Sequence, residues 1–470
     1  MKTSIKFRLW NLASAIHRLL PLSVGKKKQL KRITIQKLGI KMPPFPNSTH
    51  DYLNYIQSIC ANYSNLTTPE LIRQVHGAYA SRSFSSKPLV SIIIPVYNNI
   101  RETLICLLSI SKIEDACPYE IIVADDFSQD ETEKILGECL GIRYLRNTKN
   151  LGFLRTCNYA SSYMSGEFIV LLNNDTIVLS NWLDSLASTF VTHKNVGLVG
   201  SKLLFPDGRL QEAGGFIWKD GTGWNFGRGD DPQRPKYNYL RDVDYCSGAS
   251  IMLPKKIWDT LGGFDNFFEP AYYEDTDMAF RVKNAGYKVL YQPKSVVIHV
   301  EGLSSGTELT AGIKKFQQVN HQKFVDRWKD ILNTHGITDD SIKQQKSFSR
   351  QSKGRILYVD NPDTTSKSDK AIDFPALLQK MRLFKELDFE VSFISSVNIF
   401  PNSQADEMQN IGIECLYSPY ITSVDDYLKN ESGQFSFVFF SHSPTEVDYI
   451  NLLKRYDPQV QIVSNLTHHT

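Results

Sequence analysis

The stretch Phe168–Val178 (FIVLLNNDTIV) restricts the fold more than any other part of the chain. It opens with an apolar run, Phe168 to Leu172, which is short and rich in strand-favouring residues, and this predicts a strand buried on both faces of a sheet. The run ends at Asn173-Asn174-Asp175. Because open α/β sheets bind ligands at the carboxyl ends of their strands, Asp175 is expected to hold a metal ion or a sugar hydroxyl. The same residues can instead turn the chain or cap a helix that begins near Asn181.

Length and composition indicate two or three ordinary globular domains in 470 residues, with 41% hydrophobic and 22% charged residues. A formal net charge of +3 argues against a general nucleic-acid binder. The seven cysteines show no C-x-x-C spacing, which favours reduced thiols in the cytoplasm over a disulfide framework or a zinc site. No apolar run approaches the roughly 20 residues that span a bilayer, and no secretory signal is predicted.

Residues 1–87 are expected to form an N-terminal helical segment. Residues 1–35 interleave apolar groups with basic ones and predict an amphipathic helix. Such a helix can lie on an anionic membrane surface, or it can dock on the protein's own core. Prolines at 43, 44 and 46 separate it from a second helical stretch at about 49–80, and residues 81–87 are predicted to be a linker.

From Pro88 the pattern alternates between strands and helices. The runs VSIIIP (90–95) and YEIIVA (119–124) predict buried strands, and helices are expected at about 101–113, 130–140 and 154–164. This rhythm predicts a mainly parallel sheet with right-handed crossovers, whose functional edge gathers Tyr97, Asp125 and Asp175. Neighbouring carboxylates repel one another, and a nucleoside diphosphate with a divalent metal ion would satisfy them. The absence of P-loop and Gly-x-Gly-x-x-Gly motifs argues against a P-loop NTPase and a dinucleotide oxidoreductase.

Further along, the aromatics Trp218, Trp224 and Phe226 in a glycine-rich region can stack on sugar rings or fill a small core. Residues 272–286 predict a helix with an acidic start and a glycine stop, in which Glu274 and Asp275 are either functional or mere caps. Strands are predicted at 288–291 and 295–298. They lead to His299, which is either a structural histidine or, with the following glycine-serine loop, a group that closes over a metal and a diphosphate.

Eight segments in order resemble one known family: SIIIPVYNN, IIVADDFSQD, RNTKNLGFLRTCN, FIVLLNND, CSGASIML, GGFDNFF, YEDTDMAFRVKNAGY and VVIHVEGLSSG. Together they are similar to glycosyltransferase family 2, particularly to rhamnosyltransferase-like members that act in bacterial surface-polysaccharide assembly. The resemblance covers roughly residues 88–305. It implies an α/β GT-A nucleotide-diphospho-sugar transferase fold over residues 88–330.

The resemblance also implies roles for individual residues. Asp275 would be the general base, with Glu274 beside it, and Arg281 would order their helix. Asp175 would be the last residue of the metal-binding Asp-x-Asp motif, whose first position is Asn173 here, and His299 would act at the metal or diphosphate side. The nucleotide-sugar pocket would be formed by Pro95, Val96, Tyr97, Asn98, Asp125, Asp126, Gly152, Arg155, Asn158, Asn173 and Asn174. In it Asp125 would address the nucleobase, Asp126 and Ser128 would shape the same turn, and Arg155 would contact a phosphate.

The implied reaction is a metal-dependent, inverting transfer of a hexosyl or deoxyhexosyl group by single displacement, in which Mg²⁺ or Mn²⁺ neutralises the departing diphosphate. The expected donor is a UDP- or dTDP-linked sugar, and the expected acceptor is a glycan or lipid-linked glycan. The enzyme is expected in the cytoplasm, peripherally at the inner face of the cell membrane.

The tail is expected to contain a linker at 331–353 and a Rossmann-like half-domain at 354–470. Strands are predicted at 355–359, 390–395 and 435–441, with a helix at 373–387. This segment resembles the N-terminal half of a family 4 GT-B glycosyltransferase, although NPDTTSKSDKA replaces the usual glycine-bearing loop. Because GT-B enzymes hold their donor mainly in the second half, the tail is expected to be non-catalytic.

Two other functions remain open on the same fold. One is a non-catalytic glycan-binding or scaffold protein, which the Asn-Asn-Asp sequence favours slightly. The other is a sugar nucleotidyltransferase. The late position of the Glu-Asp pair, and the lack of an early glycine-rich loop bearing Arg and Lys, argue against it.

Overall fold

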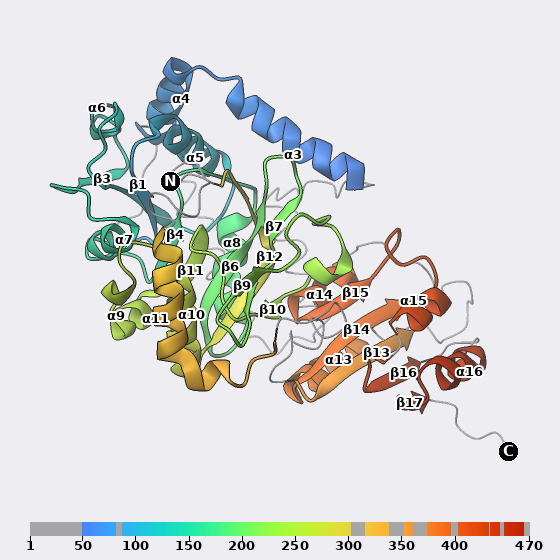
Figure 1. Cartoon of the computed structure of the whole chain (residues 1–470). Coiled ribbons are helices and arrows are strands. Elements are labelled where there is room, and N and C mark those ends of the chain that lie inside the picture. The colour runs from blue at the N-terminus through green and yellow to red at the C-terminus, as the bar shows by residue number, and fades with distance from the viewer. Residues whose placement is uncertain are drawn as a thin grey trace, which may run out of the picture.

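The computed structural model describes residues 49–80, 87–301, 315–337, 352–360, 374–395, 403–431, 433–441 and 446–464 (Figure 1). The helix expected within residues 1–35 lies outside these ranges. The second expected helical stretch forms two helices, α3 (Thr49–Ser64) and α4 (Thr68–Ala80). On α4, Leu71, Val75 and Tyr79 are buried at a spacing of four residues, so they lie on one face, and this face packs on the next helix along the chain. No helix within the described ranges combines the length and the apolarity needed to cross a membrane.

Four parallel strands form the first half of a large sheet: β1 (Val90–Val96), β2 (Tyr119–Asp125), β3 (Arg143–Arg146) and β4 (Phe168–Leu172). The intervening helices are α5 (Ile100–Lys112), α6 (Thr132–Gly137) and α7 (Phe153–Ser161). β1 is buried along its whole length, as a strand covered on both faces should be. Strands β4, β1 and β2 are neighbours in that order, so their carboxyl ends share one edge. The strand and helix pattern read from the sequence is confirmed here.

The second half of the sheet is mixed rather than parallel. Its strands are β5 (Thr176–Val178), β6 (Val196–Leu204), β7 (Leu210–Glu212), β10 (Arg241–Asp242), β11 (Ser250–Pro254) and β12 (Lys288–His299). The main path runs β10-β12-β6-β11-β4-β1-β2-β3, with β5 paired to β12 and β7 to β6. β11 runs antiparallel to both β4 and β6. The prediction of a mainly parallel sheet therefore holds only for its first half.

The two strands predicted at 288–291 and 295–298 are one strand, β12. Pro293 interrupts the apolar pattern and cannot donate a ladder hydrogen bond. The strand accommodates it through a register shift between Gln292 and Val296.

A separate two-stranded hairpin, β8 (Gly215–Ile217) and β9 (Gly223–Asn225), follows β7 in the chain. The aromatic cluster predicted around it is mainly core: Trp218 and Phe226 are 4% and 5% exposed, and the Trp218 ring stacks on Trp224 at 5.9 Å. The remaining helices of this part are α8 (Trp182–Thr192), α9 (Lys255–Leu261), α10 (Glu274–Asn284) and α11 (Lys315–Leu332), with short turns η1 (Pro235–Tyr237) and η2 (Asn266–Phe268).

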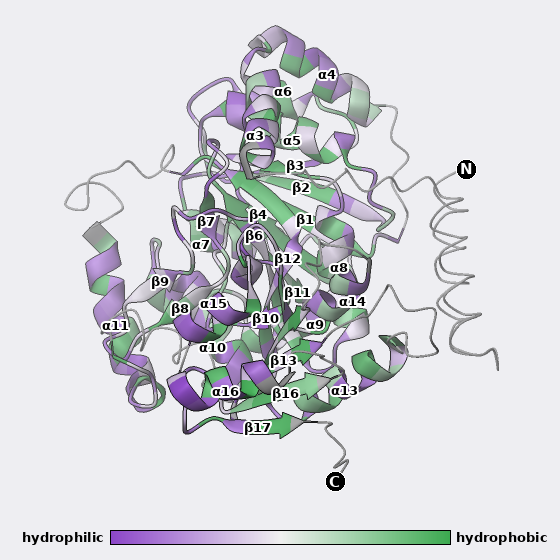
Figure 2. Cartoon of the chain, turned by 90° about the vertical axis from the view of Figure 1, so that its right-hand side faces the viewer, coloured by the Kyte–Doolittle hydropathy of each residue, from purple (hydrophilic) through white to green (hydrophobic). Residues whose placement is uncertain are grey.

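The C-terminal part forms a separate five-stranded parallel sheet with its own core. The strand order is β15 (Ile413–Leu416), β14 (Phe389–Ser395), β13 (Gly354–Asp360), β16 (Phe437–Ser441) and β17 (Gln461–Ser464). Its helices are α13 (Phe374–Glu386), α14 (Ser403–Asn410), α15 (Val424–Asn430) and α16 (Glu446–Tyr456). Figure 2 shows that the strands of both sheets are mainly hydrophobic, whereas outer helices such as α16 carry many hydrophilic residues.

The two parts are joined by polar contacts between residues 231–240 and the β15 side of the C-terminal sheet (Figure 1). The Tyr417 hydroxyl donates to the backbone oxygen of Gln233 at 2.5 Å, and the Tyr420 hydroxyl donates to Asp231 Oδ2 at 2.5 Å. The Leu240 N–H donates to the Gln409 oxygen at 2.9 Å. The domain limits expected from the sequence remain predictions, although this arrangement agrees with a division in the region of residues 331–353.

Candidate active site

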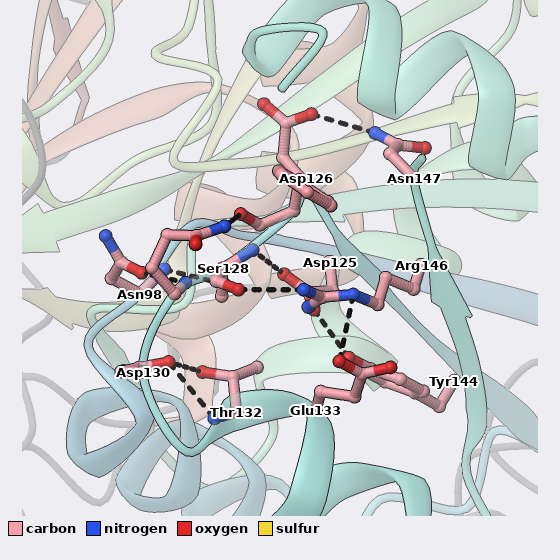
Figure 3. A network of polar contacts seen from close by, with 12 residues as sticks. Asn98, Asp125, Asp126, Ser128, Asp130, Thr132, Glu133, Tyr144, Arg146 and Asn147 are labelled. Carbon is pink, nitrogen blue, oxygen red and sulfur yellow. Dashed lines mark hydrogen bonds and ion pairs between the residues drawn. The ribbon is translucent and has the colours of Figure 1, made fainter. Parts of the chain in front are cut away.

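The turn after β2 is held by a dense polar network (Figure 3). Asp125, at the end of β2, is fully buried. Its Oδ1 accepts from the Ser128 N–H at 2.8 Å, and its Oδ2 accepts from the Tyr144 hydroxyl at 2.5 Å and from Arg146. The Arg146 guanidinium also lies over the Phe127 ring, 5.1 Å from its centroid. Asp125, predicted to address a nucleobase, therefore already shapes the turn through Arg146.

The neighbouring Asp126 organises a second loop. Its carboxylate accepts from the Asn147 amide (2.8 Å) and from the N–H groups of Leu151 (2.6 Å) and Gly152 (2.8 Å). Gly152 has φ 83°, a conformation that favours glycine, and a Cβ there would lie 3.2 Å from the Pro270 oxygen. Asp126 and Gly152 thus fix where α7 begins.

The four pocket residues predicted after β1 divide into two groups. Pro95 and Val96 are buried within β1, and the Val96 oxygen accepts from the Asp126 N–H at 2.7 Å. Tyr97 is 42% exposed, so its ring can contact a ligand. The Asn98 N–H donates to Ser128 Oγ at 2.7 Å, and Asn98 Oδ1 accepts from the Gln129 N–H. The β1 and β2 turns are therefore bound to each other, and Tyr97 stands at their surface.

On α7 the two predicted side chains have different partners. Arg155 is half exposed and donates from Nε to Glu269 Oε1 at 2.5 Å. Asn158 exchanges two hydrogen bonds with the backbone of Phe264, at 2.8 and 2.9 Å. Asn158 therefore positions the Gly262–Phe264 turn, while Arg155 has a flexible, exposed guanidinium that can be redirected to a phosphate.

At the end of β4, two asparagines precede the predicted metal residue. Asn174 is buried and donates to Thr103 Oγ1 at 3.0 Å, so its side chain anchors the loop to α5. The Asn173 N–H donates to the Ala249 oxygen at 3.0 Å, and its side-chain amide lies 3.4 Å from His299 Nε2. Of the two, Asn173 faces the predicted metal residues.

Asp175 and His299 are brought together as predicted, with His299 Nε2 3.2 Å from Asp175 Oδ1. β5 pairs with the end of β12, and this pairing places residue 176 opposite His299. Although Oδ1 is that close to a ring nitrogen, the contact lacks hydrogen-bond geometry, and Oδ1 is buried with no hydrogen-bond partner among the described residues. An unpartnered buried carboxylate oxygen is costly and indicates that a ligand completes the site.

The tautomer of His299 follows from its other partner, Gln211. The Gln211 amide nitrogen donates to Glu301 Oε2 at 3.2 Å, which leaves Gln211 Oε1 to accept from His299 Nδ1 at 3.0 Å. With its proton on Nδ1, the ring presents the Nε2 lone pair to Asp175 and Asn173. A lone pair facing a carboxylate oxygen fits a divalent cation between them, and a hydrogen bond to Nδ1 is how metal-bound histidines are commonly oriented.

The two residues can supply only part of a metal's coordination. Within the described residues, no group of three or more His, Cys, Asp or Glu side chains is arranged around one point. A cation held by Asp175 and His299 would need its other ligands from a substrate or from water.

The predicted acidic pair lies in the first turn of α10. Asp275 Oδ2 accepts from the Gly248 N–H at 2.9 Å, and its Oδ1 accepts from the Thr276 N–H at 2.7 Å. Burial raises the pKa of Asp275, and these hydrogen bonds oppose the increase. Burial, followed by the charge of Asp275, raises the pKa of Glu274 to about 8, and Glu274 Oε2 has no partner among the described residues. Glu274 is therefore tuned toward proton exchange near neutral pH, and the pKa of Asp275 is raised above that of a free aspartate.

The loop 246–249 connects the two halves of the site. Its Gly248 N–H binds Asp275, and its Ala249 oxygen binds Asn173, which is two residues from Asp175. Adjacent residues of one loop thus bind the general-base candidate, Asp275, and the residue two positions before the metal candidate Asp175. Asp125 is farther along the same sheet edge, since β1 separates β2 from β4.

Sequence reasoning missed Gln211, Glu212, Tyr144 and Arg146. The first two lie on the three-residue strand β7, which is too short to give a periodic signal. Tyr144 and Arg146 alternate along β3, so both side chains leave the same face beside Asp125. The signal that could have found Tyr144 and Arg146 is their spacing of two residues on either side of the apolar Leu145, which is typical of a strand with one polar face.

Comparison with known proteins finds a family similar to part of this chain. Residues 91–257 match the family described as Glycosyl transferase family 2. The chain is 28% identical over 279 residues to the uncharacterized protein y4gI of Sinorhizobium fredii, covering 56% of this chain and 30% of that protein. It is 29% identical over 229 residues to the O-antigen biosynthesis protein RfbC of Myxococcus xanthus, covering 46% and 18%. The chain thus spans less than a third of the length of these two relatives.

Solved structures give more distant likenesses. One is GalNAc-T7 with UDP, GalNAc and Mn²⁺, at 16% identity and a TM-score of 0.43, covering 53% of this chain and 50% of that one. Another is the S. aureus TarS fragment 1–349 in complex with UDP-GlcNAc, at 17% identity and a TM-score of 0.38, covering 56% and 72%. The α/β architecture described above thus contains a region, residues 91–257, that is similar to glycosyltransferase family 2.

Proposed function

We propose that this chain transfers a sugar from a nucleoside-diphosphate donor to a hydroxyl of a glycan acceptor, with inversion at the anomeric carbon. The observation that carries the proposal is the unpartnered Asp175 Oδ1, which lies within the residues that match family 2 and opposite the His299 Nε2 lone pair.

Asp175 and His299 would hold Mg²⁺ or Mn²⁺, and when bound the ion would neutralise charge on the diphosphate leaving group. Asn173 stands where the resemblance places the first Asp of Asp-x-Asp. Its amide is neutral and faces His299 at 3.4 Å, so the protein contributes one carboxylate to the cation instead of two. We expect binding of the free ion to be weak and to tighten when the donor's phosphates add ligands.

Asp275 would remove the proton from the acceptor hydroxyl. As that oxygen forms its bond to the anomeric carbon, the bond from this carbon to the diphosphate oxygen breaks on the opposite face, and the proton remains on Asp275. Hydrogen bonds from Gly248 and Thr276 hold the carboxylate oxygens in place, while burial keeps its pKa above that of a free aspartate. Arg281, which binds Asp277 at 2.6 Å and two backbone oxygens near Gly263, would keep α10 in position.

The nucleotide would bind over the turns after β1 and β2. Tyr97 offers an exposed ring there, and Asp125, Asp126, Asn98 and their partners keep the two turns rigid (Figure 3). A rigid turn lowers the entropy lost on binding. Arg155 would reach the phosphates, and Gly152 and Asn158 would border the sugar through the loop and turn that they fix.

The biological setting is proposed by analogy. A relative is an O-antigen biosynthesis protein, which favours a role in bacterial surface polysaccharide synthesis. We propose a UDP- or dTDP-linked hexose or deoxyhexose such as rhamnose as donor, a glycan or lipid-linked glycan as acceptor, and work in the cytoplasm at the inner face of the membrane. The C-terminal sheet, similar in its sequence to the first half of a GT-B enzyme, would serve docking and not catalysis.

The test is a screen of nucleotide sugars with Mg²⁺ or Mn²⁺, following release of nucleoside diphosphate with and without glycan acceptors. Asp275→Asn should lose release while still binding donor. Asp259→Asn is the matched control, because Asp259 makes only an exposed ion pair with Lys255. Donor binding without release under all conditions would favour a scaffold, and pyrophosphate release would indicate nucleotidyl transfer; either result would overturn the proposal.

A further inference from the structure

A carboxyl group that the proposed reaction does not yet use lies beside the general-base candidate. Glu212, the last residue of β7, is 1% exposed. Its Oε1 accepts from the Ser247 N–H at 2.9 Å, and its Oε2 is buried with no partner among the residues that the structure describes. The next N–H along the chain, that of Gly248, binds Asp275. A buried acid and a half-buried one thus accept hydrogen bonds from successive backbone amides.

The two acids cannot both be ionised at low cost, because like charges at close range in a buried site repel strongly. The surroundings decide which one carries the charge. Asp275 receives the Gly248 N–H, the Thr276 N–H and the Thr276 hydroxyl, and it lies in the first turn of an eleven-residue helix, where an anion is favoured. Glu212 receives a single N–H. The negative charge therefore belongs on Asp275 and the proton on Glu212.

Among the described residues, the basic group that acts on a charge at Glu212 is Arg228. Its guanidinium donates to Glu301 Oε2 at 2.5 Å and is therefore already paired with another carboxylate. Burial first, and then the charges of Asp275 and Glu301, raise the pKa of Glu212 to about 8, while the Ser247 N–H and Arg228 oppose the increase. The titratable or charged groups that interact with Glu212 are Asp275, Arg228, Glu301, Tyr245, Cys246 and Tyr291.

We propose that Glu212 is a positioning residue of the transfer reaction: it remains a neutral carboxylic acid beside Asp275, so that Asp275 alone carries the charge of the pair and accepts the proton. This inference rests on the proposed function. Ionisation of Glu212 would place a second negative charge in the site, where it would repel the donor's diphosphate and favour a proton on Asp275.

The first test is the pH profile of kcat/KM. Ionisation of Glu212 should lower wild-type kcat/KM about tenfold per pH unit above a pKa near 8, in addition to any loss from Glu274, whose pKa is also about 8. Glu212→Gln stays neutral, so the ratio of its kcat/KM to that of the wild type should rise about tenfold per unit above that pKa. Glu212→Leu, which cannot accept from Ser247, should lower kcat/KM at all pH values. A ratio of Glu212→Gln to wild type that stays constant above pH 8 would overturn the inference.

The second test needs no turnover. In the wild type, the native state binds the Glu212 proton more tightly than the unfolded state, so this contribution to stability is lost as the pH rises from about 4.3 through about 8. The melting temperature of Glu212→Gln relative to wild type should therefore increase between pH 5 and pH 9. A constant difference would refute the protonation of Glu212, whereas absence of transfer activity in the wild type would refute only the proposed function.

Discussion

Replacing Asp277 by alanine should destabilise the domain more than any surface change, because its carboxylate binds two elements together. Asp277 is fully buried on α10, and its oxygens accept from Arg281 Nε (2.6 Å), Trp328 Nε1 (2.9 Å) and Arg327 Nη1 (3.1 Å). Trp328 and Arg327 lie on α11. Removing the acceptor leaves the Arg281 charge largely buried, and α11 loses its polar link to α10.

The magnitude follows from the partners that remain. Breaking a buried ion pair by removing one side costs about 3–5 kcal/mol. Arg281 keeps two backbone oxygens and Arg327 keeps Asp265 at 2.8 Å, so we expect the lower end, about 3 kcal/mol. For a domain of this size that corresponds to a melting temperature lower by about 6–12 °C.

Thermal unfolding followed by tryptophan fluorescence is the assay. The last of the six tryptophans is Trp328, so the signal does not come from the C-terminal sheet. Asp259→Ala removes an acid from the exposed i,i+4 pair with Lys255 and should cost only about 0.3–0.5 kcal/mol. If Asp277→Ala lowered the melting temperature no more than Asp259→Ala does, the assignment of Asp277 as the link between α10 and α11 would be wrong.

Three further changes test other parts of the molecule. Gln211→Leu removes the acceptor that orients His299, and Mn²⁺ affinity measured by calorimetry should fall about 10–100-fold; an unaltered affinity would exclude this role. Burial and then the charge of Asp184 raise the pKa of Asp115 to about 7, so its contribution to stability is complete below about pH 4 and is lost as the pH rises through 7. Asp115→Asn should flatten the pH dependence of the free energy of unfolding between about pH 4 and 7, measured by chemical denaturation. An unchanged pH dependence would contradict the raised pKa of Asp115. Tyr417→Phe removes two hydrogen bonds between the C-terminal part and residues 231–240, one donated to the Gln233 backbone oxygen and one accepted from Asn238, and should cost about 0.5–1.5 kcal/mol for each, visible as faster amide exchange in β15.

The sequence predicted the elements whose pattern is local. The apolar runs of β1, β2 and β4 identify buried strands without knowledge of their neighbours, and the acidic start and glycine stop of α10 mark its two ends. The proximity of Asp175 and His299 also followed from the sequence, through the resemblance to a family, and the structure brings these two side chains together.

Pairing between distant strands could not be predicted in the same way. β11 is as apolar as a parallel strand, and only its place between β4 and β6 makes it antiparallel. The partners of Asp125 were equally hidden, because Arg146 is 21 residues away and lies on a strand of four residues. Side-chain partners of this kind depend on which strands are neighbours. The order of strands cannot be predicted from the pattern of any single segment.

The short strand β7 has a consequence for how this domain can tolerate insertions. Its consecutive residues Gln211 and Glu212 serve opposite sides: one steadies the imidazole of His299, the other rests on the Ser247 amide beside the base. A shift of β7 by one position against β6 would move the wrong side chain to each place and set an acid against the histidine. A residue inserted between β6 and β7 should therefore be tolerated when the loop takes it up, and should be damaging when it changes the register of β7.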